Sequence, residues 1–421
     1  MIVPKKILLV ILDGIGEPLN GELPSSLEQA DLTLLNWLAR NGHTGLMENN
    51  LGERPDLGPD SGISTWCLLG YDKEEYPGRG WLDALGAGLK PKDGEVCLRA
   101  NFSTVEEVPG AHMGMIPGVS KTAMKPTLKV VDRRAGRSSE GLHELAESIA
   151  KVNIEGMWVR FYRSLGHRGV ALISSSDASP FVSDSDPGIT GAEVPEVKPT
   201  VNDDKSVHTA STLNKWSWEA YNTLRFHPSN KHRPMPANFI LLRDASIPKV
   251  IEHPFQDKHG LKAACIAASP VVRGMACALE MALVDVPGAT GDLRTNLRDK
   301  TLRALDLLRT HDMVVLHILG TDVAGHDKNR REKVGFLTKV DKEVFGRIRE
   351  YIDFKKNILV VASDNNTDVA TGLHVAGKFP YAIYTDGIKP TGASAFNERA
   401  AMATGIDNNI EDLMELVMQF R

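Results

Sequence analysis

The sequence predicts a two-domain α/β protein in which a second domain is inserted into a core built on a parallel sheet. At 421 residues the chain is too long for one ordinary hydrophobic core. Three near-continuous apolar runs each lead to an acidic residue, and these runs come from both ends of the chain. The stretch between them is rich in Pro, Ser, Asp and His. A core assembled from both chain ends must be discontinuous, so the middle stretch is the expected insertion.

The three apolar runs have the pattern of strands that are covered on both faces. They span residues 7–12, 313–319 and 358–362, and they lead to Asp13, Asp322 and Asp364. Open α/β sheets bind their ligands at the carboxyl ends of the strands. Any one of these acids could instead cap the helix after its strand. Three of them in one chain favour a shared site.

We expect residues 1–105 plus 251–421 to form a metal-binding core, and residues 106–250 to form the inserted domain. Within the insertion, residues 170–173 look like a short strand, and residues 183–187 look like a loop. After the insertion, residues 301–309 and 331–351 carry the apolar spacing of helices packed on a sheet.

The composition of the chain indicates which kinds of partner and which cellular compartment to expect. The formal net charge of -5 gives no reason to expect nucleic acid or an anionic membrane surface. No apolar stretch approaches the roughly 20 residues that span a bilayer. The four cysteines lack CxxC spacing and have apolar neighbours, which predicts buried free thiols in a reducing cytosol. A cytoplasmic protein is expected, and its oligomeric state is left open.

The sharpest local signal is a pair of candidate metal ligands, Asp322 and His326, which are four residues apart. One helical turn would place both side chains on one face, close enough to share a cation. Such pairs arise often by chance, but Asp364, Asn365 and His374 follow the next expected strand. Together with Asp13, which follows the first apolar run, these groups suffice for two metal centres. Two cations can hold both the attacking and the leaving oxygen of a phosphoryl group.

A candidate nucleophile is Ser61, in the segment 58–65. If a helix begins here, the hydroxyl lies beside the positive end of the helix dipole, where a phosphate is also stabilised. The same serine could simply cap that helix. The local sequence leaves both interpretations open.

Arginines provide the expected anion-binding element. Arg79, Arg134, Arg137 and Arg168 lie next to glycines or other turn-forming residues, and His167 precedes the last of them. An arginine side chain binds phosphate or carboxylate through two parallel hydrogen bonds. A single surface arginine is usually a solvated charge, whereas a set on the inserted domain would hold an anionic substrate over the metals.

Further short motifs follow in one order along nearly the whole chain: LDGIG at 12–16, LLGYD at 68–72, DRRAGR at 132–137, GHR at 166–168, SDSDP at 183–187, HPSN at 227–230, VPGATG at 286–291 and GHD at 325–327. In these motifs the chain resembles the archaeal-type cofactor-independent phosphoglycerate mutases of the alkaline phosphatase superfamily. The resemblance implies an alkaline phosphatase-like core sheet with an inserted smaller α/β substrate domain.

Transferred residue by residue, the resemblance implies two divalent cations (Mn, Zn or Mg) and a phosphoserine route on a small phosphorylated or phosphonylated acid. One centre would use Asp322, His326 and His374. The other would use Asp13, Ser61, Asp364 and Asn365, with Ser61 as the nucleophile. Lys333 matches the lysine that helps to hold the phosphoryl group. The implied substrate-binding residues are Arg79, Arg134, Arg137, His167 and Arg168.

The chain departs from the family pattern after the nucleophile and at one metal position. Gly62, Ile63 and Thr65 stand where the family has acidic, hydroxyl and imidazole side chains. Asn365 replaces a histidine, and its amide oxygen would favour harder cations such as Mg²⁺, Mn²⁺ or Ca²⁺. We therefore expect phosphoglycerate to be a poor substrate. The alternatives are a phosphatase or kinase-like transferase of the same superfamily, or a catalytically silent metabolite-binding homologue.

Overall fold

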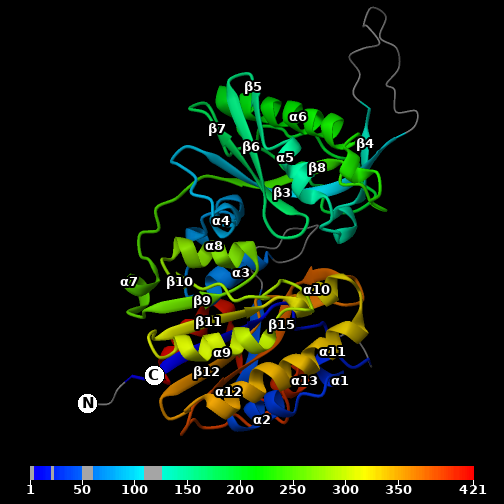
Figure 1. Cartoon of the computed structure of the whole chain (residues 1–421). Coiled ribbons are helices and arrows are strands. Elements are labelled where there is room, and N and C mark those ends of the chain that lie inside the picture. Colours follow the sequence, from blue (N-terminus) through cyan, green and yellow to red (C-terminus); the bar gives the residue numbers. More distant parts are fainter. Residues whose placement is uncertain (1–3, 20–22, 50–59, 109–125) are drawn as a thin grey trace, which may run out of the picture. The chain divides into compact units, whose positions relative to one another are not determined.

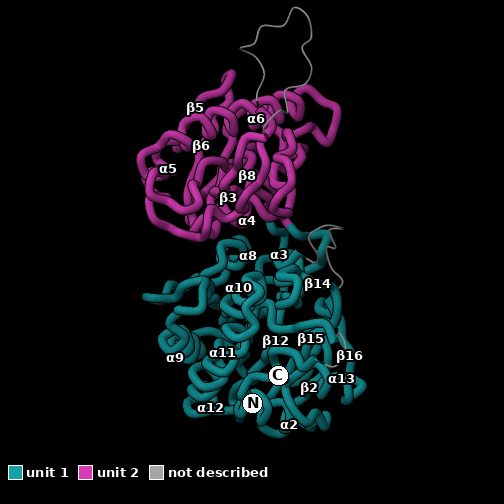
Figure 2. The backbone as a smooth tube through the Cα atoms, turned by 90° about the vertical axis from the view of Figure 1, so that its right-hand side faces the viewer, with its two compact units in different colours: residues 1–76, 251–421 teal, residues 77–250 magenta. Residues whose placement is uncertain are grey.

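The computed structural model describes residues 4–19, 23–49, 60–108 and 126–421 (Figure 1). The chain divides into two compact units (Figure 2): unit 1 is Met1–Tyr76 with Ile251–Arg421, and unit 2 is Pro77–Val250. The core is thus discontinuous, as the apolar runs predict. The insertion ends at the expected residue but begins at Pro77, not at residue 106. The reason is that the segment after Pro77 forms a helix of unit 2 and then a long strand of the unit 2 sheet.

Unit 1 is built on an eight-stranded sheet whose centre is parallel. The strand order is β10 (Ala282–Leu283), β9 (Ala263–Ile266), β11 (Met313–Ile318), β1 (Lys6–Leu12), β12 (Asn357–Ala362), β15 (Gly377–Tyr384), β2 (His43–Asn49) and β16 (Asp407–Asn409). The central strand β1 runs parallel to both β11 and β12, which confirms the three strands expected from the apolar runs. The antiparallel pairs of β15 with β12 and with β2 were not expected from the sequence. A small hairpin pairs β13 (Asn366–Asp368) with β14 (Leu373–Val375).

Helices of unit 1 cover this sheet. They are α1 (Ser26–Gln29), α2 (Thr33–Asn41), α3 (Ser61–Leu68), α7 (Phe255–His259), α8 (Pro270–Ala278), α9 (Leu297–Leu307), α10 (Gly320–His326), α11 (Arg330–Val340), α12 (Gly346–Tyr351), α13 (Glu398–Met402) and α14 (Leu413–Met418), with short turns η1 (Lys73–Glu75) and η6 (Ile410–Asp412). The expected helix 331–351 is interrupted by a π turn, η5 (Asp341–Phe345), where Asp341 accepts hydrogen bonds from the backbone of α2. Leu8, Val10 and Leu12 pack in one buried cluster with side chains of α2, α9, α11 and α12. Figure 1 shows the last three helices beside the sheet.

Unit 2 has an antiparallel sheet of its own. Its strands are β4 (Leu128–Asp132), β3 (Val96–Glu107), β7 (Arg168–Ser174), β6 (Met157–Arg163), β5 (Lys151–Ile154) and β8 (Phe239–Ser246), which pairs with β3. The helical segments are α4 (Arg79–Gly86), η3 (Ala135–Arg137), α5 (Leu142–Ser148), α6 (Asp204–Leu224) and η4 (Pro228–Asn230). Trp216 of α6 and Phe161 of β6 lie in its buried core.

Two further expectations concern membrane-spanning segments and the cysteines. Among the described residues, no helix has the length and apolar character of a membrane span; the cytoplasmic location stays a prediction. All four cysteines are free thiols, but only three are buried. Cys277 is exposed, because it lies on the outer face of α8, and apolar sequence neighbours alone do not reveal which face of a helix is covered.

Candidate metal centres

The carboxyl ends of β11, β1 and β12 bring the candidate residues to one edge of the sheet. Asp13 directly follows β1, and Asp364 follows β12. Asp322 lies in the first turn of α10, which begins just after β11. Gly14 turns the chain after Asp13 with φ 67°, and a Cβ there would lie 2.8 Å from the Cα of Asp322. Only glycine fits this left-handed, closely packed turn.

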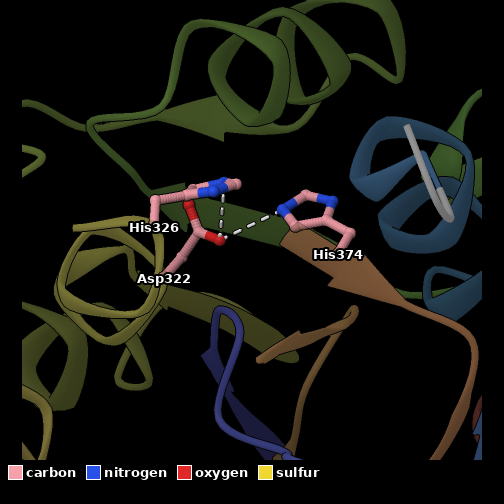
Figure 3. Close-up of side chains that lie close together, drawn as sticks. All are labelled: Asp322, His326 and His374. Carbon is pink, nitrogen blue, oxygen red and sulfur yellow. Dashed lines mark hydrogen bonds and ion pairs between the residues drawn. The ribbon is translucent and has the colours of Figure 1, made fainter. Parts of the chain in front are cut away.

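The first candidate group consists of Asp322, His326 and His374 (Figure 3). Asp322 Oδ1 lies 3.4 Å from His326 Nε2 and 3.1 Å from His374 Nε2. The backbone carbonyl of Gly372 lies 2.8 Å from Nδ1 of His326, which turns the other ring nitrogen toward the acid. The two imidazole rings are stacked, with centroids 4.9 Å apart. One carboxylate and two imidazoles are a common ligand set for Zn²⁺ or Mn²⁺.

The second candidate group consists of Asp13, His317 and Asp364, whose ligand atoms all lie within 4.8 Å of one another. His317 is on β11, paired with Ile11 of β1, and its Nε2 lies 3.3 Å from Asp13 Oδ2. All three side chains are buried. The sequence prediction missed His317. The available signal was a single polar residue inside the apolar run 313–319.

Electrostatics of the two groups differ, and both suit a cation. Burial, together with nearby Asp322, raises the pKa of Asp13 to about 7. Burial and the charge of Asp13 raise the pKa of Asp364 well above its usual value. Burial lowers the pKa of His317 to about 4, so its imidazole is neutral at pH 7. Burial alone would raise the pKa of Asp322, but His326 and His374 hold it below its usual value. Two crowded buried carboxylates beside a neutral imidazole fit a divalent cation.

Asn365 and Thr367 connect the two groups. The amide nitrogen of Asn365 donates to Asp13 Oδ1 at 2.9 Å and to Asp364 Oδ1 at 3.2 Å. Its amide oxygen accepts from the Thr367 hydroxyl at 2.8 Å, and that hydroxyl lies 2.7 Å from Asp322 Oδ1. The amide oxygen, which the resemblance implies as a ligand, is therefore turned away from the two carboxylates.

Ser61 is the first residue of α3, and this helix is tied to the second group. Asp60 caps the helix, because its side chain accepts a hydrogen bond from the backbone of Gly62 at 2.7 Å. One turn further, the Thr65 hydroxyl donates to Asp364 Oδ2 at 3.0 Å. The helix cap is thus supplied by Asp60, and the interpretation of Ser61 as a cap is not needed.

Lys333, on α11, is fully buried, and its ammonium group contacts other residues of the chain. Its Nζ lies 3.1 Å from Glu17 Oε1 and donates to the carbonyl of Thr367 at 2.8 Å. Arg330 makes a second ion pair with Glu17, at 3.0 Å. The phosphoryl-holding role of Lys333 stays a prediction, and in this structure its visible role is to anchor α11 beside the Asp13 turn.

This buried ion pair leads to a stability prediction. Glu17→Ala would leave the fully buried Lys333 ammonium without its carboxylate partner. We expect a loss of about 3–5 kcal/mol in the free energy of unfolding, measured by urea denaturation. Glu74→Ala is the control, because Glu74 is 75% exposed in a surface pair with Lys73. Equal stability of the two variants would contradict the prediction.

Unit 2 gathers the expected arginines into a larger basic cluster. Burial, then the charges of Arg168, Arg99, Arg137 and Arg133, lower the pKa of His167 well below its usual value. The further members of this cluster are Arg79 and Arg243, whose charges act on Arg99. The acids in this cluster include Asp83, 3.6 Å from Arg99, and Asp186, bound by Arg133 at 2.8 Å.

The structure thus brings four of the five expected substrate-binding residues near one another. Arg134 belongs to the same turn as Arg137, and its backbone N–H donates to Asp132 Oδ1 at 2.6 Å. Arg99, Arg133 and Arg243 also belong to the cluster and were not among the expected substrate-binding residues. Arg99 and Arg243 face each other in paired strands β3 and β8, far apart in the sequence. A partly buried group of arginines is a common binding element for phosphate and carboxylate groups.

Comparisons with known proteins identify the relatives of this chain. Residues 39–230 match the family model described as 2,3-bisphosphoglycerate-independent phosphoglycerate mutase. A Methanopyrus kandleri protein of that name is 36% identical over 408 residues, covering 94% of this chain and 92% of the relative. An Ignicoccus hospitalis protein of the same name is 34% identical, covering 99% and 97%.

Two solved structures are similar in fold to this chain. The cofactor-independent phosphoglycerate mutase of Thermoplasma acidophilum is similar with a TM-score of 0.59 and 29% identity, covering 99% of both chains. A Pyrococcus horikoshii protein is similar in fold with a TM-score of 0.76 and 24% identity, covering 99% of this chain and 97% of that one.

Proposed function

This chain belongs to the family of 2,3-bisphosphoglycerate-independent phosphoglycerate mutases, and from that premise we propose that it is a metal-dependent phosphoryl-transfer enzyme acting through Ser61. Its substrate class is a small phosphorylated or phosphonylated acid. The observation that carries the proposal is the hydrogen bond from Thr65 to Asp364, because it ties the helix of Ser61 to the second group of candidate ligands.

Two divalent cations fit the described residues. Asp322, His326 and His374 would hold one of them, while Asp13 and Asp364 would hold the other, with Ser61 and Asn365 implied by the family resemblance. When bound, such cations neutralise phosphoryl oxygens and lower the pKa of a nearby hydroxyl. Mn, Zn and Mg are the candidate metals.

The chain's own residues then account for the transfer. The Ser61 oxygen forms a bond to phosphorus as the bond from phosphorus to the substrate oxygen breaks. The hydroxyl proton of Ser61 ends on the released substrate oxygen. In the second half, the bond from Ser61 to phosphorus breaks as another hydroxyl of the same acid takes the phosphoryl group, and the proton of that hydroxyl ends on Ser61. Because Ser61 starts α3, the positive end of the helix dipole favours the phosphoserine charge, while the Asp60 side chain accepts from the N–H groups of Gly62 and Ile63.

We propose that the basic cluster of unit 2 binds the substrate's charged groups. It contains Arg79, Arg137, His167 and Arg168, with Arg134 in the adjoining turn. A bidentate arginine contact fixes the orientation of a carboxylate or phosphate. Orientation decides which hydroxyl receives the phosphoryl group.

This role predicts a binding defect in Arg168→Ala. One charged hydrogen-bonding contact is worth about 1.5–3 kcal/mol, so KM should rise about 10- to 100-fold while bound metal stays unchanged. Initial rates and metal analysis on the same preparation measure both quantities. Arg225→Ala is the control, because Arg225 pairs with Glu107 at a partly exposed site. A KM that stays at the control value would remove Arg168 from the substrate site.

The proposed function is tested by incubating Mn²⁺-loaded protein with 2- and 3-phosphoglycerate, phosphonate analogues and p-nitrophenyl phosphate, followed by ³¹P NMR. We expect transfer within a small phosphorylated acid and a phosphoprotein trapped at Ser61. Release of inorganic phosphate without rearrangement would favour the phosphatase alternative. No transfer with any substrate would favour a catalytically silent homologue.

Phosphoglycerate itself should be turned over weakly. At Gly62 an added Cβ would collide with the Tyr76 hydroxyl, so the acidic side chain of the family pattern would have to displace that hydroxyl. General acid–base help of the kind removed here is typically worth about 10²–10⁴-fold in rate. Efficient interconversion of 2- and 3-phosphoglycerate would refute this expectation and favour the ordinary mutase activity.

A further inference from the structure

The second group lacks the imidazole that the family pattern has at position 365. Asn365 directs its amide nitrogen at Asp13 and Asp364, at 2.9 and 3.2 Å, and this nitrogen is a hydrogen-bond donor. Its oxygen accepts from Thr367. In this arrangement Asn365 orients the two carboxylates and offers no ligand atom between them.

A different imidazole reaches the same place from the neighbouring strand. His317 lies on β11 opposite Ile11 of β1, and its Nε2 is 3.3 Å from Asp13 Oδ2. The ligand atoms of Asp13, His317 and Asp364 all lie within 4.8 Å of one another. The backbone of His317 is fixed as well, because the buried Lys300 ammonium donates to its carbonyl at 2.6 Å.

The His317 ring has unsatisfied bonding capacity. The side chain is 1% exposed, and neither ring nitrogen has a hydrogen-bond partner among the described residues. The contact with Asp13 is close but lacks hydrogen-bond geometry. Buried polar atoms are nearly always paired, so an unpaired imidazole aimed at two carboxylates indicates a missing partner. A divalent cation is the partner that satisfies all three side chains together.

We propose that His317 is the nitrogen ligand of the second cation, together with Asp13 and Asp364, in place of the imidazole that is absent at position 365. The inference rests on the proposed function, since it takes the second cation from there. Three protein ligands leave an open position for Ser61 or substrate. Asn365 then acts as a positioning residue, because its N–H bonds orient both carboxylates.

The test uses the full chain and Mn²⁺ alone, with binding followed by calorimetry and equilibrium dialysis. The native chain should bind two equivalents. His317→Ala should lose one of them or bind it at least about 10- to 100-fold more weakly. His311→Ala is the matched control: His311 is also buried, six residues earlier, and contacts the carbonyl of Leu307. It should bind two equivalents with native affinity.

A spectroscopic measurement keeps the inference falsifiable if His317→Ala folds poorly. In Asp322→Asn, which disables the first group, pulsed EPR of the remaining Mn²⁺ should show coupling to an imidazole nitrogen. Absence of that coupling would overturn the inference, whatever the stability of the alanine variant. So would two equivalents bound with native affinity in well-folded His317→Ala, while the proposed function would stand. A native chain that binds fewer than two equivalents would overturn both.

Discussion

Replacing Ser61 by alanine is expected to abolish phosphoryl transfer, with kcat/KM falling by on the order of 10⁴-fold or more. The reason is that no phosphoserine can form without the Ser61 hydroxyl. The first cation should remain bound, since Asp322, His326 and His374 do not depend on Ser61. Steady-state rates and mass spectrometry of the trapped phosphoprotein measure the loss.

Both neighbouring hydroxyls are engaged by other groups, and Ser64 supplies the control. Ser64 is buried, accepting a hydrogen bond from Asn49 at 2.8 Å and donating to the carbonyl of Asp60 at 3.0 Å. Thr65 is engaged with Asp364 and with the carbonyl of Ser61. Ser64→Ala should therefore retain activity within a few fold, by the usual cost of one hydrogen bond. Full activity in Ser61→Ala would rule out the phosphoserine route and favour attack by a solvent hydroxyl.

The sequence alone predicted many of the candidate residues that the structure brings together, because their signals are local. An apolar run that ends in an acid predicts a buried strand and a ligand at its carboxyl end. Asp13, Asp322 and Asp364 follow directly from that rule, since β11, β1 and β12 are adjacent and parallel. The four-residue spacing of Asp322 and His326 likewise gave a shared helix face.

What the sequence did not reveal depends on contacts between distant segments. His317 sits inside an apolar run, and only the pairing of β11 with β1 brings its ring to Asp13. Arg99 and Arg243 meet because β3 pairs with β8, more than a hundred residues away in the chain. The same pairing places β3 in unit 2, so the insertion begins earlier than its composition suggests. The orientation of the Asn365 amide likewise depends on a neighbouring side chain, because the Thr367 hydroxyl donates to the amide oxygen.

The single hydroxyl of Thr367 links the two candidate ligand groups. It lies 2.7 Å from Asp322 Oδ1 and 2.8 Å from Asn365 Oδ1, and it has one proton to donate. If Asp322 bound a cation, its oxygen would accept less strongly, and the Thr367 proton would be left to Asn365. That bond in turn fixes the amide nitrogen against Asp13 and Asp364. A cation held by Asp322 would therefore favour the carboxylate arrangement of the second candidate group.

Asp322→Asn should remove the first cation and lower kcat/KM by about 10³-fold or more. Asp322 is the one carboxylate of its group, and its Oδ1 lies 3.4 and 3.1 Å from the Nε2 atoms of the two imidazoles. The amide keeps the volume of the side chain and can still accept from Thr367, so the fold should survive. Loss of a cation that neutralises phosphoryl charge costs several kcal/mol in the transition state, and each 1.36 kcal/mol is tenfold in rate. Metal analysis of the dialysed protein and initial rates test both effects.

The matched control is Asp306→Asn, a half-exposed carboxylate paired with Arg303 on α9. It carries the same change in charge and composition but lies on a solvent-facing ion pair, so its metal content and rate should equal those of the native chain. Because the Thr367 link joins the two groups, the Asp322 variant should also bind its remaining cation somewhat more weakly than the native second centre does. Two equivalents of metal and near-native rates in Asp322→Asn would show that Asp322, His326 and His374 do not form a metal centre, and the two-cation mechanism would fall with them.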